Sequence, residues 1–207
     1  MSGEAVKKEK VQMDPKYILK LSITLLGICL VVSLLLGLVN GITADKIAAL
    51  QEQAKQESLQ AVFPDATFNE IEIGEAQAAA AEEYGVELMY IYEVADGSGY
   101  AIEVGPSGFS GTIDMVVGIN SDGTVAGISV ISNTETAGIG TNVCSDKPNK
   151  NGVGVLSQFV GMSATADNPF TVNSGSNRVD AISGATVSTK AITSGVNAAS
   201  VIFGTLG

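Results

Sequence analysis

A short stretch near the C-terminus combines a hydroxyl group with a backbone suited to holding a phosphate. Residues 180–188 read Asp-Ala-Ile-Ser-Gly-Ala-Thr-Val-Ser and lead from an extended piece into a helical pattern. Ser183 is predicted to cap that helix, and Gly184 with Ala185 would let the backbone approach a bound group closely. Unpaired N–H groups and the positive end of a helix dipole favour an anion at such a place. The Thr186 hydroxyl would be presented there and, once esterified to a phosphate, stabilised.

On the residues alone, an ordinary capped helix start is the competing interpretation, because small-residue turns before helices are common. Composition narrows the chemistry further. The sequence holds no histidine, which excludes histidine metal sites, Ser-His-Asp triads and imidazole acid–base catalysis. The two cysteines are Cys29, in an apolar run, and Cys144; we expect both to be unpaired, and they cannot supply an iron–sulfur cluster. We predict no metal site, and any redox chemistry would need an organic cofactor.

An apolar segment near the N-terminus predicts a membrane anchor. Residues 17–42 contain no charge after Lys20, and the next charge is Asp45. A bilayer's hydrocarbon core needs about 20 such residues for one helical crossing. No good signal-peptide cleavage site follows, so we expect an uncleaved transmembrane helix.

Charge predicts the orientation of this anchor in the cell membrane. The lysines before or at the start of the span are Lys7, Lys8, Lys10, Lys16 and Lys20. The positive-inside rule therefore places residues 1–16 in the cytoplasm and the following domain outside. The formal net charge of the chain is -11, and such a surface repels nucleic acid, so no nucleic-acid partner is expected.

The pattern after the span predicts an α+β domain built on an antiparallel sheet. Residues 43–63 are predicted to form a stalk helix capped by Thr43, which packs against either another subunit or its own domain. The outer domain is predicted to cover residues 64–207. Its expected strands are residues 68–73, 88–94, 99–104, 112–119 and 124–131, with a hairpin turn at 121–123. Residues 75–84 read as a short helix or an exposed loop, 155–160 as one or two helical turns, and 187–203 as a closing C-terminal helix.

The string from Asp180 to Thr186 resembles the flavinylation motif, Asp-x-x-Ser-Gly-Ala-Thr, of the FMN-binding domain family. In that family a flavin transferase moves FMN from FAD onto the motif threonine. The resemblance implies FMN in phosphodiester linkage to Thr186. It also implies that neighbouring motif residues form the recognition and binding context: Asp180, Ser183, Gly184, Ala185 and Ser188.

Two further stretches resemble the same family. Residues 108–119 resemble its glycine-rich hairpin, and residues 133–140, Asn-Thr-Glu-Thr-Ala-Gly-Ile-Gly, resemble its His-x-Glu-Thr-Pro-Gly-Leu-Gly. Asn133 stands where the family has histidine, so this chain manages without an imidazole there. The resemblance implies that the matching residues contact the cofactor, namely Glu135, Thr136, Gly138 and Gly140. Without the family, a solvated loop is the alternative for Glu135 and Thr136.

A span, a stalk and an outer flavin domain in 207 residues resemble the G subunits of Rnf complexes, which are ferredoxin:NAD⁺ oxidoreductases that move Na⁺ or H⁺. The arrangement is also similar to the C subunits of Na⁺-translocating NADH:quinone oxidoreductases. The resemblance implies an electron-carrier subunit with no catalytic residues of its own, served by other membrane and cytoplasmic subunits and matured by a flavin transferase.

Two alternatives of other classes stay open at this point. A free-standing, membrane-anchored extracellular flavoprotein would share every motif and would purify without membrane partners. A non-flavinylated membrane-anchored binding module would be colourless. An independent hydrolase is the least supported, because no nucleophile–base pair is recognisable.

Overall fold

A computed structural model describes residues 14–206 of the chain. The chain divides into two compact units, the first ending at Leu50 and the second comprising Gln51–Gly207. The sequence-based prediction of fold class is confirmed: a long N-terminal apolar helix precedes an antiparallel-sheet domain that ends in a helix.

Helix α1 (Pro15–Val62) runs through both units without a break. The predicted helix start at Thr43 is therefore wrong. The Thr43 hydroxyl donates a 2.9 Å hydrogen bond to the carbonyl of Val39, one turn back. A threonine inside a helix can satisfy its hydroxyl in this way, so it need not interrupt the helix.

Among the described residues, α1 is the one helix long and apolar enough to cross a membrane. Its large apolar side chains between Tyr17 and Ile42 are exposed on the chain itself, as a lipid-facing surface would be. Lys7, Lys8 and Lys10, on which the predicted orientation partly rests, lie outside the described residues, as does most of the predicted cytoplasmic segment 1–16.

The folded domain is built on five antiparallel strands in the order β1-β2-β3-β4-β5, each joined to the next in the chain. The strands are β1 (Phe68–Ile71), β2 (Val86–Val94), β3 (Gly99–Pro106), β4 (Ile113–Asn120) and β5 (Val125–Asn133). The predicted turn at residues 121–123 lies between β4 and β5, and Gly123 there has φ +82°, a value that favours glycine. The strand and turn predictions are confirmed.

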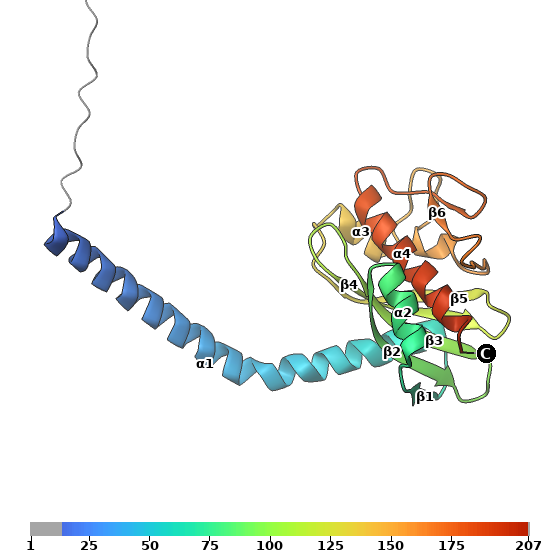
Figure 1. Ribbon diagram of the computed structural model, residues 1–207, viewed down its shortest axis with the longest axis horizontal. Coiled ribbons are helices and arrows are strands. Elements are labelled where there is room, and N and C mark those ends of the chain that lie inside the picture. Colours follow the sequence, from blue (N-terminus) through green and yellow to red (C-terminus); the bar gives the residue numbers. More distant parts are fainter. Residues whose placement is uncertain (1–13, 207) are drawn as a thin grey trace, which may run out of the picture. The chain divides into compact units, whose positions relative to one another are not determined.

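One face of the sheet is covered by α4 (Thr186–Phe203) and α2 (Glu75–Glu83), as Figure 1 shows. Residues 75–84, for which helix and loop both stood open, are thus mostly helical. Ile192, Val196 and Ile202 of α4 pack on Ile102, Val104 and other sheet residues in the main core. The predicted period of the closing helix is confirmed by this packing from Ala191 onward. Val187, which has the same spacing, is 50% exposed and does not belong to the core.

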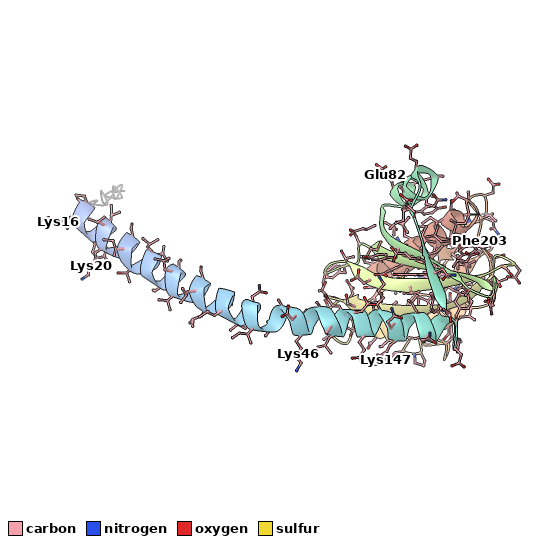
Figure 2. The ribbon with its side chains drawn as sticks, turned by 90° about the horizontal axis from the view of Figure 1, so that it is seen from below. Lys16, Lys20, Lys46, Glu82, Lys147 and Phe203 are labelled. Carbon is pink, nitrogen blue, oxygen red and sulfur yellow. The ribbon has the colours of Figure 1, made fainter. Side chains whose placement is uncertain are left out.

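The opposite face of the sheet receives the last turns of α1, as Figure 2 shows with Phe203 of α4 on the other side. Leu59 and Val62 are buried there against Tyr92 and Val116. Of the two possibilities for the predicted stalk, packing against its own domain is therefore observed for its last turns, where Ser58, Leu59 and Val62 are buried.

Paired glycines make room for this helix end. Gly118 of β4 and Gly127 of β5 are cross-strand neighbours. A Cβ on Gly118 would lie 1.9 Å from Cγ1 of Val62, and a Cβ on Gly127 would lie 3.6 Å from the Val62 Cα. Because glycine has no side chain, the end of α1 can approach the backbone of the sheet closely at this point.

The chain between β5 and α4 folds over one end of the domain in short elements. They are α3 (Gly140–Cys144), the 3₁₀ turn η1 (Leu156–Gln158), and the parallel pair β6 (Thr171–Val172) and β7 (Arg178–Val179). The helical turns expected at residues 155–160 are present as η1. Phe159 and Phe170 meet edge to face beneath this region with ring centroids 5.0 Å apart, which anchors the segment to the core.

Candidate functional site

Thr186 is the first residue of α4 and is half-buried. The N-cap is Ala185, whose side chain offers no hydrogen bond, so the prediction that Ser183 caps this helix is wrong. Gly184 has φ +84° and turns the chain, and Ala185 N then donates to the carbonyl of Ile182 at 3.0 Å. The helix therefore begins after that turn, and Ser183 is left exposed.

A cavity of about 250 Å³ opens on one side of Thr186. Its lining residues are Phe109, Glu135, Thr136, Ile139, Gly140, Gly184, Ala185, Thr186, Val187 and Ser188. Phe109, Ile139 and Val187 are 69%, 47% and 50% exposed, and a group of large apolar side chains left in water around one cavity indicates a binding site. The cavity, hereafter the apolar cavity, suits a flat and largely apolar ring system.

A second cavity, of about 540 Å³, opens on another side of the same threonine. Its lining residues are Pro148, Asn149, Lys150, Asn173, Arg178, Asp180, Ala181, Ile182, Ser183, Gly184 and Thr186. This cavity, hereafter the polar cavity, is lined by the charged side chains of Lys150, Arg178 and Asp180. Glu135 is the one charged residue in the lining of the apolar cavity. Only Gly184 and Thr186 line both, so Thr186 lies where an apolar and a polar compartment meet.

Glu135 ties the walls of the apolar cavity together. Its buried carboxylate accepts a 2.9 Å bond from the backbone N–H of Ser110 and a short bond from the hydroxyl of Ser188. The loop after β3 is thereby fastened to the first turn of α4. A buried charge held by two donors keeps a fixed position.

The glycines around Glu135 are required by its carboxylate. A Cβ on Gly108 would lie 2.4 Å from Glu135 Oε1, and a Cβ on Gly140 would lie 2.2 Å from Oε2. Asn133, which stands where the resembling family has histidine, accepts a 3.2 Å bond from the Glu135 N–H. The amide thus stabilises the turn that presents the carboxylate, without an imidazole.

Thr136 and Gly138 differ in where they lie. The Thr136 hydroxyl is 3.2 Å from that of Ser110, on the rim of the apolar cavity. Gly138 lines neither cavity; it has φ +77° and its N–H donates to Thr141 Oγ1 at 2.9 Å. Its place in the sequence pattern follows from the turn into α3 rather than from the cavities.

Asp180, the first residue of the motif, is fixed from several directions. Its carboxylate accepts bonds from Arg178 Nε at 2.6 Å and Asn151 Nδ2 at 3.0 Å. Its backbone N–H donates to Gln158 Oε1 at 2.7 Å, and Gln158 Nε2 donates back to its carbonyl at 3.1 Å. These contacts hold the loop that leads to Thr186.

Cys144 lies buried at the end of α3, and Cys29 is exposed on α1. Neither cysteine forms a disulfide. Burial, with the negative charge of Glu135 nearby, raises the pKa of the Cys144 thiol to about 11. The thiol therefore stays protonated at neutral pH and is a poor nucleophile. In residues 14–206 no three His, Cys, Asp or Glu side chains gather as a metal ligand set.

Sequence reasoning singled out neither the apolar rim nor Lys150 of the polar cavity. Phe109, Ile139 and Val187 form the rim, and Lys150 lines the polar cavity. One signal was available: Phe109 is an aromatic residue in the Gly-Phe-Ser-Gly loop of residues 108–111, where no core position is expected. Lys150 carried no signal, because only tertiary folding brings residue 150 beside residue 186.

The comparisons with known proteins agree with this geometry. Residues 108–201 match the FMN-binding domain family, and residues 13–62 match the RnfG N-terminal region. The fold and site thus define an FMN-binding electron-transfer flavoprotein.

Named relatives align over almost the whole chain. It is 35% identical over 202 residues to the G subunit of the Na⁺-translocating ferredoxin:NAD⁺ oxidoreductase complex of Acetobacterium woodii, covering 92% of this chain and 93% of that one. It is 31% identical over 191 residues to the G subunit of the ion-translocating oxidoreductase complex of Methanosarcina acetivorans, covering 90% and 94%. The chain belongs to the family of Rnf complex G subunits.

Proposed function

We propose that this chain carries FMN in phosphodiester linkage to Thr186 and relays electrons within a membrane-bound, ion-translocating ferredoxin:NAD⁺ oxidoreductase complex. The observation that carries the proposal is the position of Thr186, which lies between an apolar and a polar cavity at the start of α4. A flavin nucleotide has the same two parts, an apolar ring and an anionic phosphate.

Attachment requires a flavin transferase and FAD. Oγ1 of Thr186 forms a bond to the FMN phosphorus, the pyrophosphate bond breaks, AMP leaves, and the hydroxyl proton is released. The helix start favours the negative charge that remains on the phosphodiester, because α4 directs its N-terminal N–H groups and positive dipole end there. A covalent bond keeps the flavin on a domain outside the membrane, where a dissociated FMN would be lost.

The residues around Thr186 would hold and shield the cofactor. Bound flavin supplies one- and two-electron transfer; the protein supplies position and environment. Phe109, Ile139 and Val187 form the apolar surface against which the ring would lie, and their burial under it would exclude water. Glu135 holds the opposing walls together through Ser110 and Ser188. Once the flavin is attached, electron relay through it needs no general base or nucleophile from the protein, so no independent substrate turnover is expected.

The assembly and orientation follow from the same proposal. α1 anchors the chain as a single-pass protein with its N-terminus in the cytoplasm and the flavin domain outside. The relatives named above are subunits of ion-translocating complexes, and this chain would likewise exchange electrons with neighbouring membrane and cytoplasmic subunits. A free-standing extracellular flavoprotein is the second candidate, favoured only if the domain purifies without partners.

The test is attachment itself. The full chain is produced together with a flavin transferase, separated on a denaturing gel and viewed under ultraviolet light, and its intact mass is measured. We expect fluorescence and a mass gain of one FMN for the wild type and none for Thr186→Ala. Thr165→Ala, an exposed loop threonine, is the control and should be loaded fully. A wild type that stays dark beside an active transferase would overturn the proposal in favour of a binding module.

A further inference from the structure

The charges of the folded domain are distributed very unevenly along the chain. Residues 56–146 contain no lysine or arginine but many aspartates and glutamates. Residues 147–207 contain two carboxylates, Asp167 and Asp180, and four cations: Lys147, Lys150, Arg178 and Lys190. Apart from Lys55, which is paired with Glu103, the positive charges of the folded domain are therefore confined to the segment after residue 146, in a protein of formal net charge -11.

Two of these cations, Lys150 and Arg178, line the polar cavity beside Thr186, together with a single carboxylate, that of Asp180. Arg178 is already paired with Asp180, at 2.5 Å between Nη2 and Oδ1. Lys150 forms no ion pair within residues 14–206. The cavity therefore carries one uncompensated positive charge.

The other residues of the cavity add hydrogen-bonding capacity to that charge. Asn149 and Asn173 lie on its wall, each already fixed to the backbone of the motif loop: Asn149 Nδ2 donates to Asp180 O at 3.3 Å, and Ala181 N donates to Asn173 Oδ1 at 3.0 Å. The wall is thus held in place by contacts with the motif itself. A preformed, cationic and polar cavity of this kind fits an oxyanion better than an apolar ring.

We propose that the polar cavity is a phosphate subsite, in which Lys150 is the cation that faces the phosphoryl group joined to Thr186. Arg178, neutralised by Asp180, keeps the loop in shape, and Lys150 supplies the net charge. The phosphate would thus occupy the polar cavity, and the flavin ring would occupy the apolar cavity. This inference rests on the proposed function, since it requires a phosphodiester at Thr186.

The test compares two lysines three positions apart in the sequence. Lys150→Gln removes the charge in the cavity, whereas Lys147→Gln removes the same charge from an exposed side chain that does not line it. Each full-length variant is loaded to completion in detergent, and the ³¹P resonance of its phosphodiester is recorded. We expect Lys150→Gln to shift that resonance and Lys147→Gln to leave it at the wild-type position.

The rate of attachment gives a second measurement. At low ionic strength Lys150→Gln should be loaded about three- to fivefold more slowly, a factor at the upper end for one exposed charge pair. The deficit should shrink in high salt, because screening removes the contribution of the lysine in the wild type. Lys147→Gln should load at the wild-type rate.

Failure of the phosphate subsite can be distinguished from failure of flavin attachment at Thr186. A loaded wild type whose ³¹P resonance is unmoved by Lys150→Gln, or moved no more than by Lys147→Gln, would overturn the phosphate subsite while leaving attachment at Thr186 intact. A wild type that accepts no flavin overturns both. If Lys150→Gln accepts no flavin, Lys150→Arg decides: restored loading supports a role of charge, and continued failure overturns it.

Discussion

The end of α1 and the start of α4 differ in whether their side chains have partners within the chain. Where α1 ends on the sheet, the polar groups are paired inside the structure: Lys55 Nζ lies 3.0 Å from Glu103 Oε2, and also 3.3 Å from the centroid of the Tyr90 ring. Where α4 begins, Phe109, Ile139 and Val187 remain exposed around Thr186. The side chains of the first region have their partners within the chain, whereas the apolar side chains of the second are exposed to solvent.

This contrast separates the residues that serve stability from those that serve function. Substitutions at the end of α1 should lower the free energy of unfolding without altering how Thr186 accepts flavin. Substitutions around Thr186 should alter how Thr186 accepts flavin without lowering the free energy of unfolding. Glu135 is the informative exception, because it lies in the second region yet is buried and paired like the residues of the first.

The largest loss of stability is expected from Gly118→Ala. Its new Cβ would lie 1.9 Å from Cγ1 of Val62, so the helix end must move, at a cost of about 3 kcal/mol in the free energy of unfolding. Gly127→Ala, on the neighbouring strand, meets Val62 at an ordinary 3.6 Å and is the control. Urea denaturation of the full chain in detergent measures both. Equal stabilities for the two variants would contradict the proposed fit between α1 and the sheet.

Lys55→Met should be the next most damaging, because it leaves the buried carboxylate of Glu103 without its partner. Removing one member of a buried pair costs about 3 kcal/mol, here reduced to about 2 because the Lys55 side chain is 13% exposed. Adding Glu103→Gln to Lys55→Met should restore much of the loss. Flavin attachment should be unchanged in both, and a loss of attachment would break the comparison.

The same pair predicts a pH dependence. Burial lowers the pKa of Lys55, but hydrogen bonds to Tyr92 and Glu103 outweigh it, so the folded-state pKa lies above the ordinary 10.5. A raised pKa means that this contribution to stability is fully present below pH 10.5 and is lost as the pH rises through the folded-state value. Denaturation between about pH 9 and 12 should show wild type and Lys55→Met converging. Curves that stay parallel would contradict the assignment.

Glu135→Ala should cost about 1–3 kcal/mol, because it leaves the N–H of Ser110 and the hydroxyl of Ser188 without their acceptor. Unlike the two preceding substitutions, it should also reduce flavin attachment, since the loop that carries Phe109 is released. Glu135→Gln can accept from Ser110 and donate to Ser188, so it should retain most of both properties. Thermal unfolding and in-gel flavin fluorescence measure the two effects. Full loading of Glu135→Ala would show that the wall does not depend on this carboxylate.

Phe109→Ala should have the smallest effect on stability, within about 0.5 kcal/mol, because an exposed side chain contributes little to folding. Its effect should appear in the flavin, which would become more accessible to water and to a collisional quencher such as iodide. Val160→Ala removes another exposed apolar side chain, one that lines neither cavity, and is the control. Identical quenching of both variants would contradict placement of the ring against Phe109.

Local patterns were sufficient for most of the fold. The strand at residues 68–73, the Asp-Gly turn at 122–123 and the helical spacing of residues 187–203 are each properties of consecutive residues. The structure confirms the turn and the helix, and it confirms the strand over Phe68–Ile71, although burial there does not alternate from residue to residue. The errors came at helix starts. Thr43 and Ser183 both have good capping side chains, yet Thr43 bonds back to Val39 inside α1 and the turn at Gly184 moves the start of α4 beyond Ser183.

The class of this protein could be read from residues adjacent in the chain: an apolar span, a β-rich domain and a threonine in a motif that resembles a flavin attachment site. The surroundings of Thr186 could not be read in this way. Phe109 and Ile139, on one side, and Lys150, on the other, lie far from it in sequence and are brought to it by packing of the sheet, the loops and α4. Such contacts depend on how whole elements dock, which no local pattern encodes.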